Sequence, residues 1–180
     1  MKNPYSIGKK IYLRAPERDD LEGKWYEWLS DPDITQFLGD RVWPNNRDKQ
    51  KEFFESFNQK SFNDRLVLSV CLIDNDEHIG ICNLSSINYI HRYADIAYII
   101  GDKKYRDGQI ALETLSLLIE IAFQRLNLLN LKSVHMSVNP HTPLLEKLFG
   151  FKVIGKYEKL YNYKGKYVDS IHSQLSKADW

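Results

Sequence analysis

The residues best suited to chemistry lie in a polar loop between two apolar segments. Residues 93–100 are rich in Ala, Ile and Tyr, and residues 109–126 carry apolar side chains at three- and four-residue spacing. We therefore expect a strand, the loop and a long helix. The first N–H groups of a helix can bind phosphate oxygens. Arg106, Gly108 and Gln109 fall where this helix begins, so an anion site is one interpretation; on these residues alone, an ordinary loop with solvated charges is favoured.

The elements that would position this loop form a mixed α/β order. We expect strands at residues 11–14, 66–73, 79–83, 93–100, 131–138, 153–161 and 167–175, and helices at 19–29, 47–57, 109–126 and from 142 onward. No linker, repeat or low-complexity segment interrupts residues 1–180, so we expect one domain. If the strand–helix–strand unit is a crossover, the two strands that flank the long helix are parallel.

The composition argues against several classes of partner and site. The 25 Lys and Arg nearly balance the 24 Asp and Glu, so no overall field favours nucleic acid or an anionic membrane. Cys71 and Cys82 form no CxxC pair and the five His show no ligand spacing, so we expect no metal. Without a signal-like apolar core or a run of about 18 apolar residues, we expect a cytoplasmic protein. Its oligomeric state stays open, with a homodimer as one alternative.

A series of short motifs runs along nearly the whole chain. They are Ile11-Tyr12-Leu13-Arg14-Ala15, Asp19-Asp20-Leu21, Ile79-Gly80, Ala94-Asp95-Ile96, Tyr105-Arg106, Glu113, Asn139, Gly150-Phe151, Gly165 to Asp169 and Trp180. In order and spacing they resemble the GNAT superfamily of N-acyltransferases, especially its ribosomal-protein N-terminal acetyltransferase-like branch. The resemblance implies a GNAT fold, in which about four helices flank a mixed, splayed and twisted sheet of about six to seven strands. It also implies transfer of an acetyl or similar short acyl group from coenzyme A to an amine.

In this family the CoA pyrophosphate lies on a loop of pattern Arg/Gln-x-x-Gly-x-Gly/Ala. The resemblance places this site at Arg106, Asp107, Gly108, Gln109, Ile110 and Ala111. Arg106, Ile110 and Ala111 match the family pattern, whereas Gln109 stands where the family usually has glycine. A side chain there restricts φ and keeps backbone away from phosphate. We expect Gly108, one position earlier, to compensate in part.

The resemblance also places the acyl-pantetheine arm between two splayed parallel strands, residues 93–100 and 131–138. Backbone groups of Ile99 and Ile100 would hold this arm, and could polarise the thioester carbonyl as an oxyanion site. Asn139 matches the family asparagine that closes the second strand and often contacts CoA. A turn residue before Pro140 is the equally weighted alternative for Asn139.

Asp95 is the expected base or amine-binding residue. The amine must be neutral to attack, so a base, or a base acting through water, removes its proton. Asp95 stands in mid-strand where relatives carry Glu or Asp, and burial of an unpaired carboxylate there would be costly. A salt bridge to a neighbour such as Arg92 is the structural alternative. His91 is a further candidate base.

Glu146 is the candidate acid for the leaving thiolate. It stands four residues before Gly150, where many relatives carry a tyrosine that protonates the thiolate. A carboxylic acid could do so only if burial raised its pKa. Water, or Tyr161 or Tyr163 of the last hairpin, are the alternatives.

By resemblance, the acceptor pocket lies between residues 37–43 and the first two helices. The candidates to contact the amine are Trp43, His91, Tyr98, Asp33 and Asp40. Residues 87–92 resemble the same segment of spermidine N-acetyltransferases, but a polycation needs several carboxylates, and the segment around Arg41 is basic and aromatic. We expect a small-molecule amine, preferably a nucleotide-linked amino sugar. A protein N-terminus, a polyamine, or a domain that binds acyl-CoA without catalysis are the alternatives.

Overall fold

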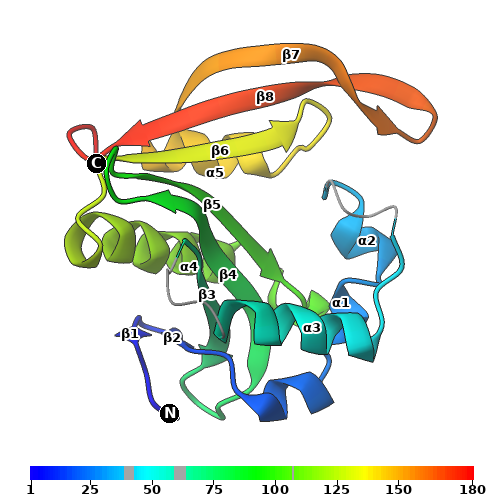
Figure 1. Ribbon diagram of the computed structural model, residues 1–180, viewed down its shortest axis with the longest axis vertical. Coiled ribbons are helices and arrows are strands. Elements are labelled where there is room, and N and C mark those ends of the chain that lie inside the picture. The colour runs from blue at the N-terminus through cyan, green and yellow to red at the C-terminus, as the bar shows by residue number, and fades with distance from the viewer. Residues whose placement is uncertain (39–42, 59–63, 107) are drawn as a thin grey trace.

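The computed structural model describes residues 1–38, 43–58, 64–106 and 108–180. Its centre is an eight-stranded sheet in the order β1-β2-β3-β4-β5-β6-β8-β7 (Figure 1). The strands are β1 Ser6–Ile7, β2 Ile11–Arg14, β3 Leu66–Leu72, β4 His78–Asn88, β5 Tyr93–Ile100, β6 Asn130–Met136, β7 Lys152–Tyr163 and β8 Lys166–Ser176. The predicted fold class is confirmed. The additional strand, β1, is only two residues long, too short to show an alternating pattern.

The helices are α1 Trp25–Trp28, α2 Pro32–Thr35, α3 Arg47–Asn58, α4 Gln109–Glu120 and α5 Thr142–Phe149. The predicted helix at 19–29 is wrong: a 3-10 segment, Arg18–Glu22, ends at Gly23 in extended backbone, and α1 follows. The helix predicted at 109–126 is confirmed, with a π-helical last turn. α5 ends at Gly150, whose φ of 83° suits glycine. None of the helices that the structure describes is both long and apolar enough to cross a membrane.

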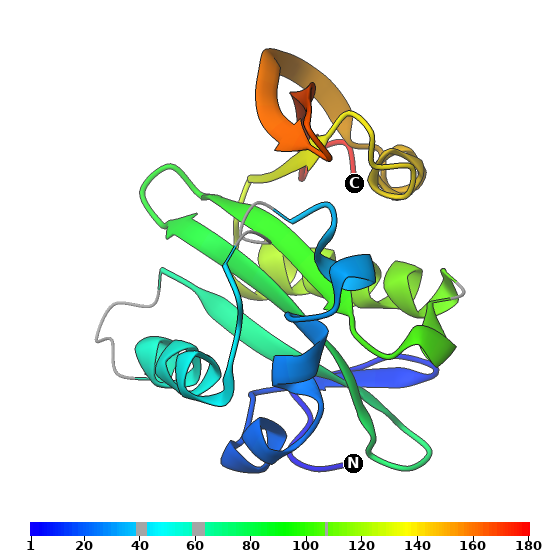
Figure 2. The ribbon, with the colours of Figure 1, turned by 90° about the vertical axis from the view of Figure 1, so that its right-hand side faces the viewer.

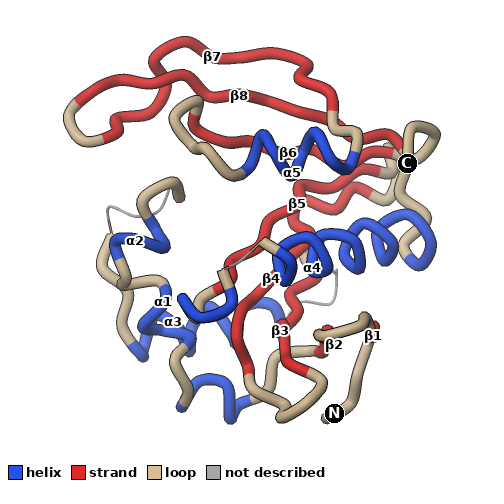
Figure 3. The backbone as a smooth tube through the Cα atoms, turned by 180° about the vertical axis from the view of Figure 1, so that it is seen from behind, coloured by secondary structure: helices blue, strands red, loops and turns tan. Residues whose placement is uncertain are grey.

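Helices cover both faces of the sheet. α4 packs on one face, where Leu118 and Ile119 are fully buried in the larger core cluster. On the other face, Trp25, Trp28 and Phe54 of α1 and α3 form a smaller cluster. Figure 2 shows α1 and α3 in front of the sheet, and Figure 3, in which the molecule is seen from behind, shows α4 on the opposite face. The middle strands are therefore held from both sides, as their apolar sequences require.

The parallel strands β5 and β6 pair over only three positions. Tyr93 lies opposite Asn130, and the last pair is Asp95 with Lys132. Beyond this point β5 continues beside β4 to Ile100, whereas β6 continues beside β8 to Met136. The two strands diverge, and among the described residues no strand pairs with the second half of β5 on that side. The predicted crossover and the splayed sheet are both confirmed.

A buried ion pair fastens the first helical segment to the sheet. Arg14 on β2 donates two hydrogen bonds to the Asp20 carboxylate, at 2.7 and 2.8 Å. Ser69 of β3 donates to the same carboxylate at 3.0 Å, and Nδ1 of His78 lies 3.3 Å from it. Burial raises the pKa of Asp20, but the hydrogen bonds from Arg14 and His78 outweigh it and hold this pKa well below its usual range. The His78 ring also meets the Trp28 ring edge-on, so the cluster anchors α1.

We expect Asp20→Asn to lower the free energy of unfolding by about 3–5 kcal/mol, because Arg14 would keep a buried charge without its counter-charge. The folded-state pKa of Asp20 lies below the unfolded value, so its contribution is complete above about pH 4 and is lost as pH falls further. The gap between wild type and variant should therefore narrow below about pH 4. Urea titrations over this range, with exposed Asp19→Asn as control, measure it. A gap that is constant down to pH 3 would contradict the assignment.

Gly101→Ala should destabilise the end of β5. A Cβ at Gly101 would lie 1.9 Å from the Trp28 ring, so α1 and the strand would have to separate. Overpacking of this kind costs about 1–3 kcal/mol. Gly155→Ala is the matched control, since its Cβ would meet no atom within 4 Å. Denaturant titration of both variants gives the comparison, and equal stabilities would disprove the steric argument.

Candidate active site

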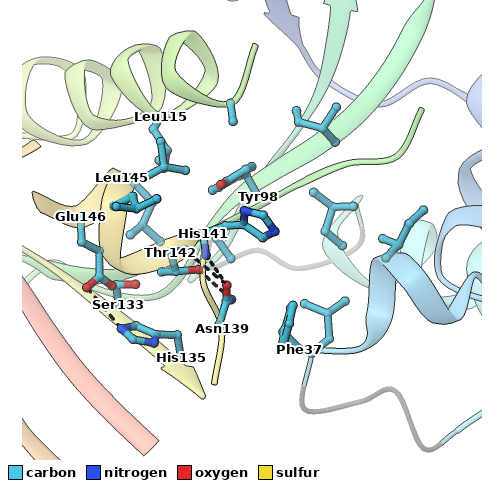
Figure 4. A pocket seen from close by; sticks show the side chains of 18 of the residues that line it. Phe37, Tyr98, Leu115, Ser133, His135, Asn139, His141, Thr142, Leu145 and Glu146 are labelled. Atoms are coloured by element: carbon cyan, nitrogen blue, oxygen red, sulfur yellow. Dashed lines mark hydrogen bonds and ion pairs between the residues drawn. The ribbon is translucent and has the colours of Figure 1, made fainter. Parts of the chain in front are cut away.

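A pocket of about 460 Å³ occupies the divergence between β5 and β6 (Figure 4). β5 contributes residues 96–100 and β6 contributes 133–135. α4 and α5 supply side chains from two further sides, and residues 36–38 after α2 close the wall opposite. Among the residues that the structure describes, no three His, Cys, Asp or Glu lie close enough together to hold a metal ion. The pocket therefore offers backbone groups of an open strand together with a few polar side chains.

The open strand presents alternate backbone groups to the pocket. The N–H of Gly101 donates to the carbonyl of Ile79 at 2.8 Å. Because alternate residues of an antiparallel pair turn their N–H and C=O toward the partner, Ile99 faces β4, whereas Tyr98 and Ile100 face the divergence. Of the two positions predicted to hold a ligand by backbone, Ile100 has the required orientation and Ile99 does not. The other residue whose backbone groups face the divergence is Tyr98.

The start of α4 forms one end of the pocket. Gly108 precedes the helix with a φ of 89°, a conformation that favours glycine, and its missing Cβ leaves open space. The first hydrogen bond of α4 runs from Leu112 N–H to Gly108 O at 3.0 Å. The amides of Ile110 and Ala111 thus lie in the first turn, where a helix offers N–H groups to anions. Asp107, like Asp40 and Arg41, lies outside the described residues.

The glutamine that replaces the usual glycine is directed elsewhere. Lys10 Nζ donates to the Gln109 side-chain oxygen at 2.6 Å. One turn along α4, the Glu113 carboxylate accepts the N–H of Lys10 at 2.9 Å and the N–H of Lys9. Within the described part of the chain, Gln109 does not line the pocket. The β1–β2 turn therefore holds this face of α4, and the Gln109 side chain points to Lys10.

Arg106 lines the pocket beside this helix start. Its Nε donates to the carbonyl of Ile100 at 3.0 Å, and one terminal nitrogen donates to the carbonyl of Gly101 at 2.8 Å. The guanidinium thus braces the loop against the end of β5 and places a positive charge next to the first turn of α4. Sequence reasoning found the charge and missed the bracing role.

Tyr98 and Asn139 both line the pocket. Burial raises the pKa of Tyr98 to about 12, so its hydroxyl is neutral at physiological pH. The Asn139 side-chain oxygen accepts the N–H groups of His141 and Thr142, at 2.9 and 3.3 Å. Asn139 therefore caps α5 in the manner of a turn residue and also lines the pocket; its contact with CoA stays a prediction.

Glu146 is buried at the floor of the pocket, with 7% of its surface exposed. Its Oε2 accepts from Ser173 Oγ at 2.7 Å and lies 3.5 Å from His135 Nε2. Burial raises the pKa of Glu146, but the hydrogen bonds from His135, Ser133 and Ser173 outweigh it, so this pKa is lowered. Glu146 therefore lacks the raised pKa that it would need to be protonated before the reaction and to act directly as the acid for the thiolate. The sequence analysis did not single out His135. The feature that could have identified it is its position two residues after Ser133 and four after Leu131, which places all three on one face of the strand.

Three predicted residues lie away from the pocket. The Asp95 carboxylate forms an ion pair with Lys132 at 3.0 Å, rather than with Arg92. Trp43 is 72% exposed, and His91 lies in the turn between β4 and β5; neither lines the pocket. The position of Asp95 follows from the strand register, which places it at the last pair before the divergence.

An aromatic contact joins the segment after α2 to the last hairpin. The ring of Phe37 stacks on Tyr163 with centroids 5.6 Å apart. The Tyr163 hydroxyl donates to the Gln36 side-chain oxygen at 3.1 Å. The sequence offers Tyr163 as an alternative acid for the thiolate, and the structure places its side chain against Phe37 and Gln36, on the α2 side of the pocket. The segment after α2 is thereby held opposite the divergence.

Comparison with known proteins agrees with this geometry. The family model described as "Acetyltransferase (GNAT) domain" matches residues 10–151. "Uncharacterized N-acetyltransferase p20" of Bacillus licheniformis is 26% identical over 177 residues, which cover 96% of each chain. The spermidine N-acetyltransferase of Vibrio cholerae, solved with CoA and spermine, gives a TM-score of 0.86 at 22% identity, covering 96% of this chain and 98% of that one. A GNAT-family acetyltransferase of Bacillus anthracis gives 0.78 at 16% identity, covering 96% and 98%.

The structural likenesses show the fold, and the family model adds the assignment. It spans β2 to the end of α5, which includes the open edge of β5, the start of α4 and Glu146. The chain therefore belongs to the GNAT acetyltransferase family, and it is an acyl-CoA-dependent N-acetyltransferase.

Proposed function

We propose that this protein transfers an acetyl or similarly short acyl group from acyl-CoA to the primary amine of a small molecule. The observation that carries the proposal is the single pocket that joins the open edge of β5, the first turn of α4 and Arg106. A thioester carrier needs an anion site for its diphosphate and an extended groove for its arm. Arg106 and the amides of Ile110 and Ala111 would hold the diphosphate. Backbone groups of Tyr98 and Ile100 would hold the arm.

The charges of the pocket favour an acceptor with a single amine. Asp33 and Glu146 are the only carboxylates among the described lining residues. Asp33 is paired with Lys103 at 3.0 Å, and Glu146 with His135. Since a polycation needs several unneutralised carboxylates, we propose an amino sugar, preferably linked to a nucleotide, as the acceptor. A polyamine, as bound by the Vibrio cholerae enzyme, is the second candidate, and a protein N-terminus, expected for the ribosomal-protein branch, is the third.

Calorimetry with acetyl-CoA, followed by thiol release with an amine panel, tests this function. The panel contains nucleotide-linked amino sugars, free amino sugars, aminoglycosides, polyamines and short peptides. We expect saturable binding of acetyl-CoA and the fastest thiol release with an amino sugar. Binding without turnover on any amine would indicate a non-catalytic acyl-CoA-binding domain. Absence of binding at millimolar acetyl-CoA would contradict the proposed function itself.

Arg106→Ala should raise the Kd for acetyl-CoA by on the order of tenfold or more, because a hydrogen bond to a charged group contributes about 1.5–3 kcal/mol. Lys104→Ala is the matched control: it removes an exposed cation from the same loop. Thermal melting of both variants separates lost binding from the loss of the contacts with Ile100 and Gly101. An unchanged Kd in a folded Arg106→Ala protein would refute the diphosphate assignment.

A further inference from the structure

The two carboxylate oxygens of Glu146 differ in their surroundings. Oε2 is occupied by Ser173 and His135, at 2.7 and 3.5 Å. The Ser133 hydroxyl also faces this carboxylate, but within the described part of the chain no group forms a hydrogen bond of normal geometry to Oε1, which is buried. A buried carboxylate oxygen without a donor is costly. Because Glu146 lines the pocket, a group that enters the pocket, water or a bound ligand, can supply this donor.

His135 holds this carboxylate in place. Its Nδ1 is bonded to the carbonyl of Met136 at 3.0 Å, so Nε2 is the nitrogen that faces Glu146. Figure 4 shows the Glu146 side chain descending from α5 toward Ser133 and His135 on β6. Burial alone would lower the pKa of His135, but the hydrogen bond that the imidazole donates to Glu146 outweighs it, so this pKa is raised. The imidazole therefore holds the carboxylate through Oε2, and Oε1 is left for a ligand.

Resting on the proposed function, we propose that Glu146 carries the proton of the reaction from the amine nitrogen to the CoA sulfur through Oε1. The neutral amine attacks the thioester carbonyl, and the new C–N bond leaves an extra proton on nitrogen. Oε1 accepts this proton, the C–S bond breaks, and the thiolate takes the proton from Oε1. Acyl-CoA and amine thus become amide and CoA thiol, and Glu146 returns to its starting state without another reactant.

The relay is consistent with the lowered pKa of Glu146, which rules out a carboxyl group that is already protonated before the amine attacks. The lowered pKa of Glu146 keeps it ionised at rest, as acceptance of the amine proton requires. Once protonated, a carboxyl group is a far stronger acid than a thiol, so transfer to the thiolate is downhill. Glu146 is then the catalytic residue, and His135 is a positioning residue that acts through it.

Glu146→Gln keeps the shape of the side chain and removes its capacity to accept a proton. We expect turnover to fall by on the order of 10²- to 10⁴-fold, while the Kd for acetyl-CoA stays within about twofold of wild type. Glu120→Gln, an exposed change on α4, is the control. Asp95→Asn is measured beside it. Wild-type turnover in Glu146→Gln, or a comparable loss confined to Asp95→Asn, would overturn the relay.

His135 gives an independent test through the pH profile. In His135→Asn, the side-chain amide nitrogen can take the place of Nδ1 and keep the hydrogen bond to the Met136 carbonyl, but the donor toward Glu146 is lost. In His135→Gln, the amide nitrogen can take the place of Nε2 and keep the contact with Glu146. Removal of the Nε2 donor raises the pKa of Glu146, and the relay starts from the ionised carboxylate. The acidic limb of kcat/KM should therefore move to higher pH by about one unit or more in His135→Asn, and by less in His135→Gln.

Two other titratable groups that share this pocket are Tyr98 of β5 and His141, the residue before α5. The remaining charged groups that line it are Arg106 and Asp33, and Asp33 forms an ion pair with Lys103. Tyr98→Phe and His141→Asn therefore accompany the pH profiles, and neither should produce the shift seen in His135→Asn. If Glu146→Gln does not fold, the pH profile of His135→Asn decides, and an unshifted acidic limb overturns the relay. If the relay is wrong but the proposed function is right, the wild-type protein still turns over. If the proposed function is wrong, the wild-type protein shows no turnover either.

Discussion

The site depends on the divergence of β5 and β6 after three residue pairs. Two parallel strands that stay together satisfy each other's backbone groups, whereas strands that separate leave N–H and C=O groups that need another partner. Here β6 follows β8, and β5 follows β4. The second half of β5 is consequently an open edge in the interior of a sheet. An extended ligand that adds itself as a strand is the natural occupant of such an edge.

Different contacts fix the two sides of this divergence. On the β5 side, the Arg14–Asp20 pair and His78 secure α1, and Trp28 packs against Gly101 at the strand end. On the β6 side, Ser173 and His135 connect α5 to β8 and β6 through Glu146. These polar clusters are buried, and each links elements far apart in sequence. The opening is therefore held by the fold, so a ligand would enter a largely preformed site.

The sequence could predict the helices and strands, but not where two strands separate or which way each residue points. The strands at residues 11–14 and 93–100 and the helix from residue 109 follow from periodicity and glycine placement, and the structure confirms them. Periodicity does not say where two strands part, so Asp95 was expected at the reaction centre and not at the last pair. The choice between Ile99 and Tyr98 likewise rests on one tertiary bond, Gly101 to Ile79. The partner of Gln109 comes from a turn about 100 residues away, which no local pattern can show.

Because β5 and β6 diverge in one direction, the Glu146 cluster and the start of α4 lie at opposite ends of the pocket. Ser133 follows Lys132 directly, so the Glu146 cluster lies at the narrow end, next to the last strand pair. Arg106 and the start of α4 lie at the wide end, beyond Ile100. From residue 96 to residue 100 the strand advances roughly 13 Å, at about 3.3 Å per residue. A ligand that reaches both ends must therefore carry its anionic group well away from its reacting carbonyl, on an extended arm. That requirement selects a long thioester carrier over a compact acyl phosphate, and it explains how the buried carboxylate and the proposed anion site can share one pocket without neutralising each other.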